Sequence, residues 1–378
     1  MKSPSLQILF WLAITFLPTT TVDAEDTTRL DQDHLLQYRD TNGNVQPVRT
    51  KTDWEIRRAS IVKGMTTIMG KLPGDNRRAP LAIQQLEEHD AGTYIRRLIT
   101  YQSETKSRTP AYLCIPKDVL AGKRRANAVL CLHPTNGEVG HQVVLGIAGQ
   151  TGQAYAAELA QAGYVTLSPS YPQMANYWPN LSELGYASGT MKAIWDNIRG
   201  IDLLASFPYV DHSNGFAAIG HSLGGHNAIF TAVLEPRITV LAISCGFDAF
   251  PDYFEGIEKN WLAGAGWCQT CYMPRLANYR GQLNQIPFDF PELLGALAPR
   301  KLFVNAPLGD RNFAPLGDRN FRWQSVDRCA AAARPIYKLI GSEDNLIIKH
   351  PDCGHDFPEP LRQAAYRTIA SVLHPEES

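Results

Sequence analysis

The hydrophobic positions of this 378-residue chain follow two spacings that alternate from about residue 127 onward. Short, almost wholly apolar runs predict strands that are covered on both faces, as in a parallel sheet. Longer runs with apolar residues three or four apart predict amphipathic helices. The predicted strands are residues 127–132, 164–167, 216–220, 238–244, 301–305, 336–340 and 346–349, and the predicted helices are residues 153–162, 190–207, 227–234 and 361–373. Strands that alternate with helices imply an α/β fold with a mostly parallel sheet and right-handed crossovers.

The residues before this alternation predict an extension and a hairpin. Residues 25–90 are polar and suggest helices, with a helical stripe of apolar residues between 52 and 70. Two segments with period-two patterning, 93–103 and 109–116, flank a polar bend and predict an antiparallel hairpin. We therefore divide the chain into an N-terminal helical extension, residues 25–90, and a main α/β domain, residues 91–374.

The alternation breaks after the predicted strand 238–244. Residues 246–299 are too long for a simple connection. They are rich in aromatic side chains, namely Phe247, Phe250, Tyr253, Phe254, Trp261, Trp267, Tyr272, Tyr279, Phe288 and Phe290. This lid-like insert follows the sixth strand, where a lid over an active site could be built. The alternative is that most of these aromatic residues pack in a small core of the insert and only a few line a cleft.

The first 24 residues have the pattern of a secretory signal peptide. One lysine precedes an apolar run, residues 6–17, that is too short to span a bilayer. Val22 and Ala24 are small residues three and one positions before the expected cleavage site. We expect residues 1–24 to be removed, so that the mature protein begins near Glu25 and is secreted or periplasmic. Retention as an N-terminal anchor is the alternative.

Charge and cysteine content restrict the function further. A net charge of -1 disfavours a role in binding nucleic acid or an anionic membrane surface. Seven cysteines are an odd number, so in an exported protein at least one thiol stays free or pairs outside the chain. Cys268 and Cys271 form a C-x-x-C, but nothing nearby completes a zinc site or a redox fold. We expect a local disulfide or two unreactive thiols there.

Residues 216–227, which read F-A-A-I-G-H-S-L-G-G-H-N, carry the strongest chemical signal. Gly220, Ser222 and Gly224 form a G-x-S-x-G motif between a predicted strand and a predicted helix, the context of a nucleophile elbow. The turn is so sharp that the residues two before and two after the nucleophile must lack side chains. Backbone N–H groups at the helix N-terminus are then free to receive an oxyanion. The alternative is a chance motif in a loop, but Gly225 adds the close helix packing that an elbow needs.

A serine hydroxyl needs a base to remove its proton and an acid to orient that base. In this architecture the order along the chain is serine, acid, histidine. Of the ten histidines, His355 alone lies after a glycine in a loop between a late strand and the final helix, so we expect it to be the base. His221 and His226 are tethered too closely to Ser222 to reach its hydroxyl. His133 ends a strand at the same edge, with a hydrogen-bonded structural role as the alternative.

A tandem duplication leaves the acid open. Residues 306–313 and 314–321 both read A-P-L-G-D-R-N-F, so Asp310 and Asp318 compete for the role. Asp310 keeps a short spacing to the preceding strand, whereas Asp318 keeps the spacing to the following helix. We prefer Asp310 because a strand end is the more rigid element. Asp248, just after the strand before, is a further candidate.

Two backbone N–H groups are expected to form an oxyanion hole. One belongs to Leu223, the residue after the nucleophile. The other should come from the loop that follows the predicted strand 127–132. Pro134 has no N–H, so Thr135 or Asn136 must supply it, and we favour Thr135. A plain turn residue is the alternative role for Thr135.

Taken together, these motifs resemble the α/β-hydrolase superfamily. His133-Pro134-Thr135, Ala298-Pro299-Arg300 and Gly354-His355-Asp356-Phe357 are similar to its dienelactone-hydrolase-like and acetylxylan-esterase-like branch. The resemblance covers roughly residues 93–373 and implies a mostly parallel, eight-stranded sheet and a serine hydrolase that acts on an acyl ester. Dienelactone hydrolases proper use a cysteine nucleophile, so their substrate does not carry over to Ser222. The duplicated segment does not belong to the pattern.

The expected activity is hydrolysis of a carboxylic ester through Ser222, His355 and Asp310 (or Asp318), by way of an acyl-enzyme. We expect no metal and no organic cofactor. The expected partner is a small-molecule ester or an ester on a polysaccharide, with no nucleic acid and no membrane after signal cleavage. A serine peptidase or another acyl hydrolase with the same triad is one alternative. A catalytically impaired, hydrolase-like binding protein is the other, and the sequence leaves the oligomeric state open.

Overall fold

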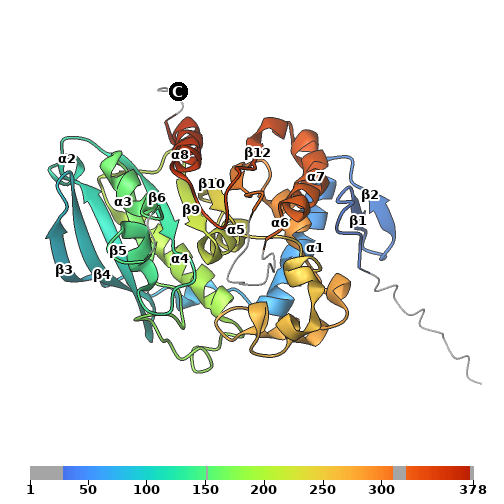
Figure 1. Ribbon diagram of the computed structural model, residues 1–378. Helices are drawn as coiled ribbons and strands as arrows, with labels where there is room; N and C mark the ends of the chain where they lie inside the picture. Colours follow the sequence, from blue (N-terminus) through green and yellow to red (C-terminus); the bar gives the residue numbers. More distant parts are fainter. Residues whose placement is uncertain (1–28, 150–151, 310–320, 375–378) are drawn as a thin grey trace, which may run out of the picture.

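The structure is a computed structural model that describes residues 29–149, 152–309 and 321–374 (Figure 1). The expected signal peptide, residues 1–24, and both candidate acids of the duplication, Asp310 and Asp318, lie outside the described residues.

Within the described residues, a sheet of ten strands runs through the molecule in the order β12-β11-β10-β9-β6-β7-β5-β4-β3, with the short β8 beside β6 (Figure 1). The strands are β3 (Gln84–Asp90), β4 (Tyr94–Glu104), β5 (Ser107–Pro116), β6 (Ala126–Leu132), β7 (Val165–Pro169), β8 (Val210–Asp211), β9 (Phe216–His221), β10 (Ile238–Ser244), β11 (Lys301–Asn305) and β12 (Leu346–Lys349). From β12 to β7 neighbouring strands are parallel, whereas β7, β5, β4 and β3 pair antiparallel. The predicted α/β fold with a mostly parallel sheet is confirmed.

Helices cover both faces of this sheet. Those of the main domain are α2 (Lys117–Leu120), α3 (Tyr155–Gln161), α4 (Gly189–Ser206), α5 (Leu223–Leu234), α6 (Phe290–Leu297), α7 (Trp323–Ile340) and α8 (Glu359–Leu373). Successive residues of a buried strand point into different cores. In β6, Val129 and Cys131 pack with α3 and α8, whereas Ala128 and Leu130 join the larger core of α4 to α7. The unbroken apolar runs of the sequence therefore reflect a sheet that is covered on both sides.

Side-chain caps define where several helices begin. Ser188 precedes α4, and its Oγ accepts a hydrogen bond from the backbone N–H of Met191 at 3.0 Å. Asp289 and Glu292 form a reciprocal capping box at the start of α6, in which Glu292 accepts from the backbone N–H of Asp289 at 2.9 Å. Such caps satisfy backbone donors that have no partner inside the helix.

The N-terminal extension is only partly helical, so the prediction of a helical segment for residues 25–90 was incomplete. It contains the expected helix, α1 (Lys51–Met69), but also the hairpin of β1 (Gln37–Arg39) and β2 (Val45–Pro47), and it ends in edge strand β3. All residues of β3 are exposed, so the strand has no pattern of apolar residues from which it could be predicted. The extension is fixed to the main domain by an ion pair between Arg57 of α1 and Glu292 of α6, at 2.6 Å.

Two further predictions were wrong. Residues 336–340 form the last turns of α7 and not a strand. A short apolar run at the end of an amphipathic helix looks like a buried strand, and its length cannot separate the two. In the described part of the chain the sheet also has ten strands instead of eight, because β3 and the two-residue β8 add to it.

The insert between β10 and β11 has its own arrangement of short 3₁₀ helices before α6. They are η3 (Tyr253–Gly256), η4 (Glu258–Trp261), η5 (Gly266–Cys268), η6 (Pro274–Tyr279) and η7 (Leu283–Gln285). Phe250 contacts the rings of Trp261, Phe288 and Phe290, and Phe230 of α5 contacts the latter two. Most of the aromatic residues therefore pack in a core that continues into the main domain.

Cys268 and Cys271 of the insert are free thiols, and burial raises the pKa of each to about 11. Of the two sequence-based alternatives, the structure shows two free thiols and no local disulfide. Among the described helices, none is both long enough and apolar enough to cross a membrane.

Candidate active site

Ser222 stands on the turn between β9 and α5, as the G-x-S-x-G motif predicts. Its φ of 55° and ψ of -123° lie in a region that residues other than glycine rarely adopt. The backbone N–H of Ser222 donates to the carbonyl of Ser244 at 2.8 Å, and its carbonyl accepts from the N–H of His226 at 3.0 Å. These two bonds hold the strained residue between a strand end and the first turn of a helix. The side chain is mostly buried.

The glycines around Ser222 are required by close backbone approach. A Cβ at Gly220 would lie 2.2 Å from the carbonyl carbon of Gly224. A Cβ at Gly224 would lie 2.0 Å from the carbonyl oxygen of Leu132, the last residue of β6. Neither obstacle is a flexible side-chain tip, so any side chain would displace backbone. The expected steric reason for both motif glycines is therefore observed.

The same contact brings the candidate oxyanion donors onto adjoining segments. Leu223 is the first residue of α5, and Thr135 lies in the loop that leaves β6 after Leu132. The Oγ1 of Thr135 is 3.2 Å from the phenol oxygen of Tyr272 in the insert. Asn136 has a local role instead, because its Oδ1 accepts from the backbone N–H groups of Glu138 and Val139.

His355 lies in the connection between β12 and α8 (Figure 1), which contacts the ends of β9, β10 and β11. The centroid of its ring is 4.8 Å from that of His221, the residue directly before Ser222. The ring of Phe321 is also near, at 6.0 Å between the centroids. The structure thus brings His355 to the elbow, over a distance of more than a hundred residues in sequence.

Three polar residues at adjacent strand ends anchor the His355 loop. His221, Ser244 and Asn305 are in register across β9, β10 and β11. The Nδ2 of Asn305 donates to the Oγ of Ser244 and to the carbonyl of Asp356, both at 2.9 Å. The Nδ1 of His221 is 2.9 Å from the same Oγ. A continuous polar row therefore joins the residue before the nucleophile to the residue after His355.

Three other histidines near the motif, His133, His221 and His226, are buried and make contacts that support the fold. The Nε2 of His133 accepts from the backbone N–H of Tyr171 at 2.9 Å, so its Nδ1 carries the proton that faces the carbonyl of Pro134. Burial lowers the pKa of His133 to about 4. Burial first, and electrostatic repulsion from His355 second, hold the pKa of His221 well below its usual value. The ring of His226 is buried against Trp267, at 4.0 Å and 7° between the planes, and burial lowers its pKa to about 3.

Aromatic residues of the insert reach the elbow. Trp267, besides stacking on His226, contacts Tyr272 at 5.0 Å and Phe321 at 6.4 Å between ring centroids. A wall of rings thus extends from the Thr135 loop to His355. The sequence marked the insert as rich in aromatics, but it did not single out Phe321, which belongs to the duplicated segment.

Of the three candidate acids, the structure describes only Asp248. Asp310 and Asp318 lie outside the described residues, but Gly309, which precedes Asp310, donates its backbone N–H to the carbonyl of Cys353 at 3.0 Å. Asp248 is 2% exposed, and its Oδ2 accepts from the backbone N–H of Arg322 at 3.4 Å.

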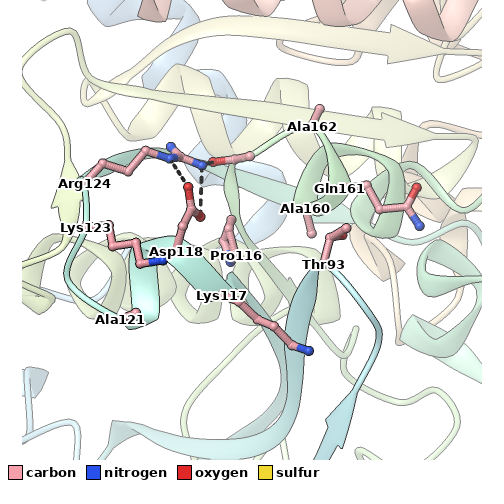
Figure 2. Close-up of a pocket in the computed structure, with 11 residues that line it drawn as sticks. Thr93, Pro116, Lys117, Asp118, Ala121, Lys123, Arg124, Ala160, Gln161 and Ala162 are labelled. Atoms are coloured by element: carbon pink, nitrogen blue, oxygen red, sulfur yellow. Dashed lines mark hydrogen bonds and ion pairs between the residues drawn. The ribbon is translucent and has the colours of Figure 1, made fainter.

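A separate pocket of about 690 Å³ lies elsewhere, between the end of α3 and the segment around α2 (Figure 2). Figure 2 shows Asp118 paired with Arg124, at 2.6 Å, and the side chains of Lys117 and Lys123 nearby. Of the predicted catalytic residues that the structure describes, Ser222 and His355, neither lines this pocket.

Comparisons with known proteins now identify the architecture. The chain is similar to the structure of a glucuronoyl esterase from Solibacter usitatus, with a TM-score of 0.66, 20% identity and coverage of 89% of this chain and 97% of that one. A protein from Bacteroides fragilis described as an acetyl xylan esterase is also similar, with a TM-score of 0.56, 17% identity and coverage of 86% and 85%. The chain has the α/β-hydrolase fold. The fold that the sequence motifs imply is thereby confirmed.

A sequence relative points in the same direction. The 4-O-methyl-glucuronoyl methylesterase 1 of Sodiomyces alcalophilus is 29% identical over 179 residues, which are 44% of this chain and 34% of that protein. The match therefore spans about a third of the relative. No protein-family model matches the chain. In the α/β-hydrolase fold the nucleophile, the acid and the histidine follow in this order along the chain, which is the order of Ser222, the aspartates and His355.

Proposed function

We propose that this protein is a serine carboxylic ester hydrolase with Ser222 as nucleophile and His355 as general base. The observation that carries the proposal is the meeting of two segments at one sheet edge. The strained Ser222 turn is followed by a helix N-terminus, and the His355 loop is bonded to the neighbouring strand ends, with its ring 4.8 Å from that of His221. Strain of this kind is retained where the surrounding structure enforces it, which is typical of active sites.

The first half-reaction forms an acyl-enzyme. The Oγ of Ser222 attacks the ester carbonyl carbon while His355 takes the hydroxyl proton. The carbonyl oxygen becomes an oxyanion, which the backbone N–H groups of Leu223 and Thr135 stabilise by about 3 kcal/mol each. The tetrahedral intermediate collapses, and the leaving alkoxide receives the proton from His355.

The second half-reaction releases the acid. A water molecule donates its proton to His355 and attacks the acyl-enzyme carbonyl, and the returning proton restores the Ser222 hydroxyl. These reaction steps need no metal and no organic cofactor, because the nucleophile, the base and the oxyanion donors are all protein groups.

Asp310 is the acid we propose for orienting His355, with Asp318 as its duplicated rival. The bond from Gly309 to Cys353 supports Asp310, because it ties the residue before Asp310 to the residue two before His355. Asp248 remains a third candidate, since it contacts the chain next to Phe321, a ring neighbour of His355.

The proposed substrate is an ester of a uronic acid unit in a carbohydrate. The support is the naming of similar proteins as glucuronoyl esterases and a glucuronoyl methylesterase. In such an ester the carboxyl carbon belongs to the sugar, so the sugar stays on Ser222 and the alcohol leaves. In an acetylated polysaccharide the sugar would be the leaving group instead. Residues 1–24 support a secreted or periplasmic location, where such polymers are found.

The test is a substrate panel with matched variants. We expect the mature protein to hydrolyse methyl or benzyl glucuronate with a higher kcat/KM than p-nitrophenyl acetate. Ser222→Ala should lower kcat by about 10⁶-fold and loss of the acid by about 10⁴-fold, as in other serine hydrolases with a triad. Comparison of Asp310→Asn, Asp318→Asn and Asp248→Asn identifies the acid.

Ser213→Ala, at an exposed serine in the loop before β9, is the matched control and should keep full activity. A folded wild-type protein that cleaves none of these esters would contradict the proposal and favour a binding protein. Activity that survives Ser222→Ala would contradict the assigned nucleophile.

A further inference from the structure

Trp178 is unusual among the large hydrophobic residues of the molecule. It is 65% exposed, more than any other large hydrophobic side chain in the described part of the chain. It lies in the connection from β7 to α4, which begins at the same sheet edge as the Ser222 turn, because β7 and β9 run parallel through their common neighbour β6. An exposed indole at the active-site edge of a hydrolase is a candidate for contact with substrate.

The indole is held in place and is not a loose surface side chain. Its Nε1–H donates to the carbonyl of Ala175 at 2.7 Å. Gln173 and Tyr177 are joined by a backbone bond of 2.8 Å, which closes a tight turn before Trp178. Gln173 and Ala175 have positive φ values of 64° and 47°, which are uncommon for residues other than glycine. A turn that keeps two such residues is fixed by its surroundings.

The turn is anchored to the protein interior through Tyr177. Tyr177, the neighbour of Trp178, is buried, and its phenol donates to the Oδ2 of Asp196 at 2.9 Å. Asp196 also pairs with the fully buried Lys192 at 2.6 Å. Trp178 therefore projects into solvent from a turn that is anchored on a buried ionic cluster, and this anchoring restricts its position.

The turn is also attached to the loop that carries the proposed oxyanion donor. The backbone N–H of Ala175 donates to the carbonyl of Gly137 at 3.1 Å, two residues after Thr135. The two segments pack so closely that a Cβ at Gly140 would lie 2.8 Å from the Cβ of Ala175. Trp178 thus belongs to the rim beside the reacting ester and not to a distant face.

The surface around Trp178 suits a sugar better than a protein. Among the described residues, Ile147 is the one other exposed large hydrophobic side chain in the connections from β6 to α3 and from β7 to α4, and it is only 40% exposed. A protein partner would need a broader apolar patch. Asn176 and Asn180 are exposed on either side of Trp178. A flat apolar ring with amide groups at its border matches a pyranose, which has C–H groups on its face and hydroxyls at its edge.

We propose that Trp178 is a stacking platform for a sugar unit of the substrate that lies beyond the unit bearing the ester. This inference rests on the proposed esterase function, since it names how that site holds a carbohydrate chain. The indole face takes the apolar side of the sugar ring, and the rigid turn keeps the chain aligned with the ester at Ser222. Trp178 acts in binding and takes no part in bond cleavage.

The experiment compares kcat/KM for a glucuronoyl ester carried on a xylo-oligosaccharide with kcat/KM for methyl glucuronate. Trp178→Ala should lower the ratio of the two by about 10- to 100-fold, the scale found for aromatic platforms that stack nucleobases. The loss should lie in KM, and Trp178→Phe should restore part of it. Leu86→Ala, at a residue 57% exposed on edge strand β3, is the control and should leave the ratio unchanged.

Binding separates this inference from the proposed function. Calorimetry with an unesterified xylo-oligosaccharide should show binding to Ser222→Ala and its loss in the Ser222→Ala, Trp178→Ala double variant. An unchanged ratio together with unchanged binding would overturn the role of Trp178 while leaving the esterase intact. Absence of all ester cleavage in wild type would overturn the proposed function, and the binding result would then decide about Trp178. A dimer that Trp178→Ala dissociates would assign the indole to self-association and overturn the inference.

Discussion

The strain at Ser222 can be measured by comparing Ser222→Gly with Ser222→Ala. Both variants remove the hydroxyl, so both lack the proposed nucleophile and differ only in the Cβ. At φ 55° and ψ -123° alanine keeps the strain of serine, whereas glycine adopts this conformation freely. The comparison therefore isolates the backbone.

The magnitude follows from two opposing terms. A non-glycine residue in such a region costs roughly 1–3 kcal/mol. Glycine loses additional chain entropy on folding, roughly 0.5–1 kcal/mol relative to alanine. The mid-range values of the two terms differ by about 1 kcal/mol, so the free energy of unfolding of Ser222→Gly should exceed that of Ser222→Ala by about this amount. The bonds from Ser222 to Ser244 and His226 are backbone bonds, so both variants retain them.

Urea titrations followed by tryptophan fluorescence give both free energies of unfolding. The matched control is the pair Ser213→Gly and Ser213→Ala, because Ser213 is exposed and is not among the residues with positive φ. There the glycine variant should be the less stable, by up to about 1 kcal/mol. If Ser222→Gly is no more stable than Ser222→Ala, while the slopes of the titrations agree, the elbow does not store strain and the reasoning fails.

Two further predictions concern the same region. Gly224→Ala should abolish activity and lower the free energy of unfolding by more than about 3 kcal/mol, because its Cβ would lie 2.0 Å from the carbonyl oxygen of Leu132. Gly137→Ala is the control and should change the urea midpoint little, because its Cβ would meet nothing within 4 Å. Equal losses of stability in the two variants would contradict the steric argument. His226 is buried with a pKa of about 3 against about 6.5 when unfolded, so its contribution to stability is complete above pH 6.5 and is lost as the pH falls below that value. Between pH 7.5 and pH 5 this loss is about 2 kcal/mol. Urea titrations at the two pH values should therefore show that the free energy of unfolding falls by about 2 kcal/mol less in His226→Phe than in the wild type. An unchanged decline would mean that His226 titrates normally in the folded protein.

The sequence predicted the centre of the sheet because its strands are buried on both faces. The runs at 238–244, 301–305 and 346–349 match β10, β11 and β12 residue for residue. The edge was harder to predict. Strand β3 is polar and exposed throughout, and it exists because β4 offers a free row of backbone partners, which no pattern within β3 reveals.

The elbow was predictable because its constraints are local. Three glycines within six residues report a turn in which backbone meets backbone, and the contacts of Gly220 and Gly224 are the ones that such a turn implies. The surroundings of His355 were not predictable in this way. Asn305 and Ser244 are ordinary polar residues at the ends of apolar runs, and only the register of three parallel strands shows that they lie beside His221.

This polar row explains how a loop can hold the proposed base, His355, in a defined position. His221, Ser244 and Asn305 are almost completely buried at positions where apolar residues would stabilise the sheet without hydrogen-bonding requirements. A buried polar network is costly unless its groups are paired. Here the Oγ of Ser244 and the Nδ2 of Asn305 both donate to the carbonyl of Asp356, whereas the Nε2 of His221 and the Oδ1 of Asn305 have no hydrogen-bond partner among the described residues. The bonds to Asp356 fix the loop directly after His355, and the bond from Gly309 to Cys353 fixes it shortly before. The proposed base, His355, is thereby positioned by strand ends next to the proposed nucleophile, Ser222, so that the same sheet edge sets the location of both.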